Sequence, residues 1–184
     1  SVLNLDIWGE DVEDSPLVFE TGDPDGVLLP TERGYVPMPW LETPSALLPT
    51  WMFYEDGRPF EGDPRHALAS VVDRFQAMGM TPVVATEMEF YLVDAKRGKD
   101  GRPTPARSPS SGETPHDIQV YGLAEMEDFR PFFDDLYACA AAQNLPLEAA
   151  ISEYAPGQFE MTLAHKADAL QACDDAIMHK RMVK

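Results

Sequence analysis

The chain has 184 residues, and its 32 Asp and Glu against 14 Lys and Arg give a net charge of −18. This acidity argues against a nucleic-acid partner, because phosphate backbones are bound by Lys and Arg. No run of about 18 apolar residues occurs, so the sequence predicts no membrane-spanning helix and no membrane partner. The first residues lack the basic flank and apolar stretch of a signal peptide, and we expect a cytoplasmic protein.

The 44% hydrophobic content supports a packed core for one domain, or for one domain with part of another. The C-terminal residues stop inside a helical pattern without a capping signal, so we expect a chain that continues. Cys139 and Cys173 form no Cys-x-x-Cys pair and fall at apolar positions of expected helices. They are predicted to be small buried hydrophobic residues in a reducing compartment.

Residues 1–62 are rich in Pro, Gly and Asp, and turn signals separate short apolar runs. The runs Val27–Leu29, Tyr35–Val36 and Ala46–Leu48 have the composition of short strands. This segment is predicted to be the remainder of a small β-rich domain.

A domain boundary is predicted between residues 62 and 63. Asp63 is a good helix N-cap and Pro64 suits the first helical position. Apolar residues then recur at helical spacing as far as Gly79, which ends the pattern. We expect this apolar face to pack on a sheet (Leu68, Val71, Val72, Phe75 and Met78).

Residues 82–93 have the β-branched and aromatic content of a strand. Alternate residues of a strand share a face, so Glu87 and Glu89 should point to one side. A polar loop is expected over residues 94–120, with five basic residues. A helix over 124–143, strands over 147–153 and 158–163, and a helix over 166–184 should follow. The core stripe of the first of these helices is predicted to be Phe129, Phe133, Leu136 and Ala140.

A second acidic patch contains Glu153 and Glu160, separated by Pro156-Gly157. A turn at this dipeptide can bring both carboxylates to one surface. Two carboxylates about 4 Å apart repel by roughly 4 kcal/mol at an effective dielectric near 20. Neither patch contains Lys or Arg, so a divalent cation is one explanation, and oxygen ligands favour Mg²⁺ or Mn²⁺. The alternative is that these glutamates are the hydrated face of a half-buried sheet.

Taken in order, these motifs resemble the glutamine synthetase family. The resemblance is carried by Asp63-Pro64-Arg65, Glu87-Met88-Glu89-Phe90-Tyr91-Leu92, Leu147-Glu148 and Pro156-Gly157-Gln158-Phe159-Glu160. It extends upstream to Pro37-Met38-Pro39-Trp40 and Glu55-Asp56-Gly57-Arg58-Pro59, and downstream to Ala167-Asp168-Ala169-Leu170, Asp174-Asp175 and Lys180.

The resemblance implies an α+β fold. The remainder of a small β-grasp-like N-terminal domain, residues 1–62, would precede the first part of an antiparallel-sheet catalytic domain backed by helices, residues 63–184. It also implies a ligase that uses ATP to phosphorylate the γ-carboxylate of glutamate. Ammonia or an amine then displaces the phosphate. Ring-shaped homo-oligomers with active sites between subunits are expected.

The family's site residues carry over to particular positions of this sequence. The metal nearer glutamate would be held by Glu89, Glu153 and Glu160, and Glu87 would help to hold the metal that bridges the ATP phosphates. Glu148 matches a glutamate that contacts the nucleotide. Residues of the amine pocket are matched loosely by Asp6, Asp23 and Tyr121. No metal position is matched by the histidines, which are predicted to be surface or capping residues (His66, His116, His165 and His179).

The family's metal-binding histidine, further metal glutamate, substrate arginines and glutamate flap are expected beyond Lys184. The chain alone is therefore expected to be inactive. The Pro/Ser-rich loop and the Pro-Gly-Gln-Phe-Glu motif favour the branch that uses larger amines, such as polyamines, while ammonia stays open. Three alternatives remain: a non-catalytic scaffold relative, an acidic metal-binding or interaction domain, and another carboxylate–amine ligase that shares the sheet and the glutamates.

Overall fold

The computed structural model describes residues 6–10, 12, 15 and 25–184. Contacts divide the chain into two compact units, one formed by residues 1–35 and 48–81 and the other by residues 36–47 and 82–184. The boundary predicted between residues 62 and 63 falls inside the first unit and stays a prediction. Across the described part, none of the helices combines the length and apolar character needed to cross a membrane.

The first unit combines a two-stranded sheet with one helix. Strand β1 (Val27–Pro30) pairs antiparallel with β4 (Thr50–Phe53), and α1 spans Pro64–Ala77. The strand predicted at residues 27–29 is confirmed, whereas β4, a short run directly after a proline, was not predicted. The Asp63 carboxylate accepts hydrogen bonds from the backbone N–H groups of Arg65 (2.8 Å) and Met52 (3.0 Å). The predicted N-cap thus also fixes the start of α1 to β4.

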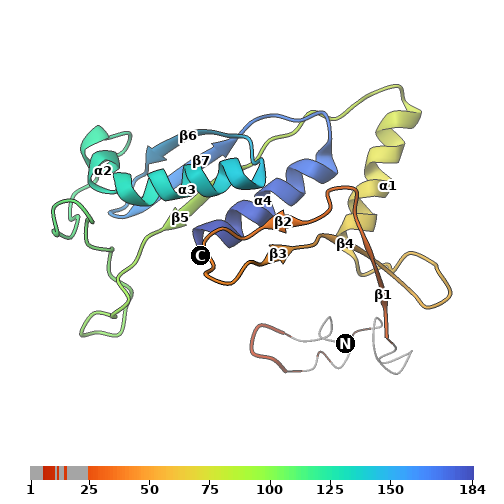
Figure 1. Cartoon of the computed structure of the whole chain (residues 1–184), viewed down its shortest axis with the longest axis horizontal. Coiled ribbons are helices and arrows are strands. Elements are labelled where there is room, and N and C mark those ends of the chain that lie inside the picture. The colour runs from red at the N-terminus through yellow and green to blue at the C-terminus, as the bar shows by residue number, and fades with distance from the viewer. Residues whose placement is uncertain (1–5, 11, 13–14, 16–24) are drawn as a thin grey trace. The chain divides into compact units, whose positions relative to one another are not determined.

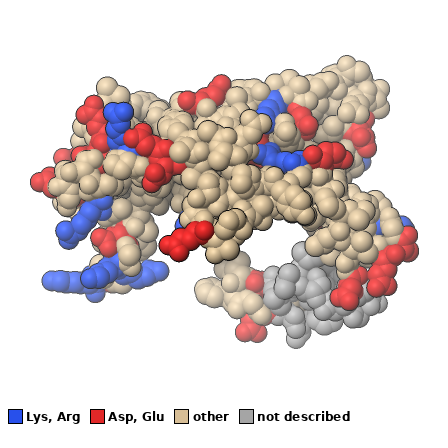
Figure 2. Space-filling model, viewed as in Figure 1, with Lys and Arg blue, Asp and Glu red and all other residues tan. Residues whose placement is uncertain are grey.

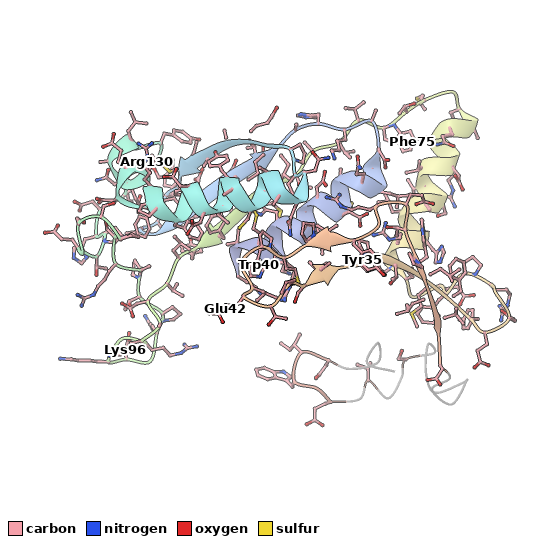
Figure 3. All side chains as sticks on the ribbon, in the orientation of Figure 1. Tyr35, Trp40, Glu42, Phe75, Lys96 and Arg130 are labelled. Carbon is pink, nitrogen blue, oxygen red and sulfur yellow. The ribbon has the colours of Figure 1, made fainter. Side chains whose placement is uncertain are left out.

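The apolar face predicted for α1 is not buried. No residue of the helix is buried, and Val71 and Met78, its C-cap, are 44% and 60% exposed. Phe75 is half-buried on the same helix (Figure 3). A two-stranded sheet offers too little surface to bury a helix of 14 residues, so the apolar face that was expected to pack on a sheet is only partly covered in this unit.

The second unit is built on a three-stranded antiparallel sheet in the order β5-β7-β6. The strands are β5 (Glu87–Tyr91), β6 (Leu147–Ser152) and β7 (Gln158–Leu163). The helices are α2 (Leu123–Asp128), α3 (Arg130–Gln143) and α4 (Ala169–Val183). Figure 1 shows α3 and α4 lying across one face of this sheet. A short strand pair, β2 (Val36–Pro37) and β3 (Ala46–Leu47), belongs to the same unit.

Two expectations for this unit are corrected. The helix predicted over residues 124–143 is two helices, because the chain leaves helical geometry at Phe129 and α3 begins with Pro131 in its first turn. Proline has no N–H to donate and is accepted there rather than inside a helix. The strand predicted over 82–93 is limited to residues 87–91, with isolated bridges at Val84 and Val93.

The core lies between the sheet and the two long helices. Phe159 and Met161 of β7 are 0% exposed, and the Phe159 ring lies 5.2 Å from that of Phe129 and 5.1 Å from that of Phe133. The predicted stripe of Phe129, Phe133, Leu136 and Ala140 is buried, as expected. Trp40 also packs against this core (Figure 3).

Helix α4 differs from the prediction at two side chains. Cys173 is exposed rather than buried, because it lies on the face of α4 that points away from the core. His179, predicted to be a surface or capping residue, is 1% exposed and lies beside Phe90, with ring centroids 6.2 Å apart. One turn earlier, the buried Asp175 pairs with Lys166 at 2.5 Å. Polar residues of α4 therefore reach into the core.

The buried His179 predicts that stability falls in acid. Neither ring nitrogen has a hydrogen-bond partner within the described structure, and burial lowers the pKa of His179 to about 4. Between pH 6.5 and 4 the His179 imidazole is protonated in the unfolded chain but stays neutral in the folded chain. The stability that is present above pH 6.5 is therefore lost as the pH falls. We expect a loss of about 2 kcal/mol between pH 7 and pH 5. Urea unfolding of the protein and of His179→Leu at both pH values measures it, and an equal loss in the variant contradicts this assignment.

Candidate functional site

The sheet face opposite the helices carries the two acidic patches. Glu89 of β5 stands directly opposite Glu160 of β7 in the antiparallel register, and Glu87 stands opposite Thr162. The exposure pattern along β5 alternates, with Glu87 and Glu89 exposed and Met88 and Phe90 half-buried. The prediction that both glutamates share one face is confirmed. Alternation in the sheet thus separates an apolar face, covered by helices, from an acidic face.

A tight hairpin brings Glu153 to the same face. Strand β6 pairs with β7 so that Ile151 stands opposite Glu160, and Glu153 donates its backbone N–H to the carbonyl of Gln158 at 2.8 Å. The alternation of side chains between the two faces is interrupted at the Pro156-Gly157 turn, as expected from the sequence. Glu153 and Glu160 therefore lie on the same side of the hairpin although they are an odd number of residues apart.

The carboxylates are close enough to influence one another. Burial raises the pKa of Glu160, and the negative charges of Glu87, Glu153 and Glu89 raise it further. Glu160 is half-buried on the central strand, between neighbours on both sides. Repulsion among such groups is relieved by a proton or by a cation.

Gln158 fixes the orientation of one of these acids. Its side-chain amide donates to Glu89 Oε2 at 2.8 Å, and its side-chain oxygen accepts the backbone N–H of Ala155 at 3.0 Å. Gln158 belongs to the Pro156-Gly157-Gln158-Phe159-Glu160 motif, yet nothing in the sequence predicts this role. The bond depends on the register between β5 and β7, which joins residues far apart in the chain.

The donor set fits a hard divalent cation as part of its coordination shell. All four side chains offer carboxylate oxygens, the ligands that Mg²⁺ and Mn²⁺ prefer. Within residues 6–10, 12, 15 and 25–184, however, no three His, Cys, Asp or Glu side chains form a group that could hold a metal ion by themselves. The four acids lie on one face and influence one another electrostatically, but they do not form a complete coordination shell. The metal assignment therefore stays a prediction.

The other predicted site residues are separate features. Glu148 is exposed in β6, within the register irregularity between Leu147 and Ala150. Tyr121 is 70% exposed and adopts a positive φ of 58°, with its N–H donated to the Ser152 carbonyl at 2.9 Å. Asp6 is exposed, and its carboxylate accepts N–H bonds from Trp8 and Glu10 in a local turn. Asp23 lies outside the described residues.

Basic side chains gather on the loop after β5. Figure 2 shows them at the lower left, and Lys96 marks the place in Figure 3. Within this loop, Arg102 Nε lies 3.6 Å from Asp100 Oδ2, and Arg107 Nε lies 4.0 Å from Asp94 Oδ2. The predicted polar surface loop is confirmed, and its charges are partly balanced locally.

Comparison with known proteins assigns the family. A family model described as glutamine synthetase, catalytic domain, matches residues 61–184. The chain belongs to the glutamine synthetase family, whose members are ligases.

Individual relatives and a solved structure are similar to much of the chain. The chain is 37% identical over its whole length to the gamma-glutamylputrescine synthetase PuuA of Escherichia coli, of which it spans 39%. It is 34% identical, over 72% of its length, to 28% of a glutamine synthetase of Thermus thermophilus. A solved structure described as a GmaS/ADP complex superposes with a TM-score of 0.72 and 26% identity, over 92% of this chain and 36% of that one. These matches support the α+β fold, whereas the β-grasp character of the N-terminal part stays a prediction.

Proposed function

We propose that the protein to which this chain contributes is an ATP-dependent ligase that joins the γ-carboxylate of glutamate to an amine. The observation that carries the proposal is the pairing of Glu89 with Glu160 on an open sheet face, where Glu87 and Glu153 add their charges. The chain spans about two-fifths of the length of the E. coli relative. The activity is therefore proposed for the whole protein.

In this proposal the acidic face binds part of a divalent-metal centre. Glu89, Glu153 and Glu160 would hold one Mg²⁺ or Mn²⁺, and Glu87 would contribute to the site of a second. When bound, such cations neutralise the charge that develops on the transferred phosphoryl group. Gln158 keeps Glu89 aimed at this face, and Glu148 would contact the nucleotide.

We further propose that the amine is larger than ammonia. One relative that matches along the whole chain is named for putrescine, and another relative, 27% identical over 90% of the chain, is a glutamate–isopropylamine ligase of Pseudomonas. Tyr121, with Asp6 and Asp23 from a neighbouring subunit, would line the amine pocket. This arrangement requires a homo-oligomer, and a cytoplasmic location follows from the reaction's need for ATP and glutamate.

The amine assignment is tested on the full-length protein with ATP, glutamate and Mg²⁺. Phosphate release is measured with ammonia, putrescine and isopropylamine as acceptors. We expect putrescine to give the highest kcat/KM, by about tenfold or more over ammonia, because a site that pairs a second polar group discriminates against analogues lacking it. Preference for ammonia would indicate ordinary glutamine synthesis. Absence of phosphate release with all three acceptors would favour a non-catalytic scaffold or an acidic interaction domain.

A further inference from the structure

The turn between β6 and β7 is tied to the end of β5 at one glycine. Gly157 has a φ of +74°, and a Cβ at this position would lie 2.9 Å from the carbonyl oxygen of Leu92. Its own carbonyl accepts the Leu92 N–H at 2.8 Å. Only glycine tolerates both the positive φ and the close approach. The Gly157 peptide thus sets how the hairpin sits against β5.

The N–H of the same glycine is held by a buried acid. Gly157 donates its N–H to Glu125 Oε1 at 2.9 Å, and Glu125 is 4% exposed in α2. The second carboxyl oxygen, Oε2, has no hydrogen-bond partner within the described part of the chain. Burial and, to a smaller degree, the charge of Asp128 raise the pKa of Glu125, whereas the Gly157 bond lowers it.

Burying a carboxyl group with only one of its two oxygens hydrogen-bonded costs folding free energy, even when that bond holds a turn. An apolar residue of similar size would avoid the cost of burying the acid, although it would leave the Gly157 N–H without an acceptor. The presence of an acid here therefore indicates that the position of the Gly157 peptide matters. The next residue shows why, since the Gln158 side chain bonds to Glu89 at 2.8 Å.

We propose that Glu125 is a positioning residue of the acidic face. By accepting the Gly157 N–H, it fixes the turn from which the Gln158 side chain holds the Glu89 carboxylate. The chain of hydrogen bonds runs from Glu125 in α2 to the backbone of Gly157, and from the side-chain amide of the next residue, Gln158, to the Glu89 carboxylate. The role rests on the proposed function, because it acts on the residues proposed there to bind the metal.

Mn²⁺ titration calorimetry of the full-length protein tests this role with four substitutions. Glu125→Met keeps the volume but removes the acceptor, and we expect about a tenfold loss of Mn²⁺ affinity, as for other residues that orient metal ligands. Glu125→Gln keeps an oxygen that can accept the Gly157 N–H and should restore the affinity to within about threefold of the unsubstituted protein. Glu127→Met is the matched control on the same helix, where the side chain is exposed, and should change nothing.

Gln158→Leu removes the last link of this chain of hydrogen bonds and should weaken Mn²⁺ binding by a similar factor, so the test does not depend on Glu125→Met folding. Unchanged affinity in Glu125→Met or in Gln158→Leu overturns the positioning role, as does a loss in Glu125→Met that Glu125→Gln fails to restore. If the unsubstituted protein binds no Mn²⁺, the proposed function itself fails and this role falls with it. That result is distinct from normal binding with insensitive variants.

Discussion

Replacing Glu160 by glutamine should lower the glutamate-dependent phosphate release of the full-length protein by about 100-fold or more, equivalent to about 2.7 kcal/mol of transition-state stabilisation. Glu160 occupies the central strand and faces Glu89 directly, so it lies amid the other three carboxylates. Glutamine preserves the shape and the strand but removes the charge that a divalent cation would need. The measurement is kcat/KM for glutamate at saturating ATP, with Mn²⁺ affinity as a second readout.

Glu127→Gln provides the matched control for this prediction, because it removes one negative charge from an exposed position of α2. Its activity should stay within about twofold of the unsubstituted protein, since isolated surface charges contribute little. Equal activity in Glu160→Gln and Glu127→Gln would remove Glu160 from the metal site. The acidic face would then be the hydrated side of the sheet.

The largest expected loss of stability follows from Phe159→Ala, at about 3–5 kcal/mol. Phe159 is 0% exposed, and its ring contacts those of Phe90, Phe129 and Phe133, which come from one strand and the start of α3. Removing the ring would leave a cavity that β5 and α3 would have to close. Chemical denaturation at pH 7.5, above the range in which His179 titrates, measures the difference.

Tyr91→Ala is a suitable comparison for Phe159→Ala, because Tyr91 is an aromatic residue of the same sheet with 57% exposure. We expect this variant to lose less than about 1 kcal/mol, since little apolar surface leaves water at this position on folding. Similar losses in both variants would mean that the helices do not cover the sheet as described.

The sequence was most informative where a local pattern determines the structure. Alternation placed Glu87 and Glu89 on one face, and Asp63 marked the start of a helix, because each depends on neighbours in the chain. Long-range pairing was harder to foresee. The Gln158–Glu89 bond, the Glu125–Gly157 bond and the burial of His179 depend on which strands and helices meet, and no short motif specifies that.

The fold also imposes a rule of length on the β6–β7 hairpin. Side chains of β7 alternate between the helix-covered core, with Phe159 and Met161, and the open side, with Glu160. One residue inserted after Gly157 would exchange the two sets, so that the Phe159 ring would face water and the Glu160 carboxylate would face the apolar core. Homologues and engineered variants should therefore accept insertions in the loop after β5 and reject them in this hairpin.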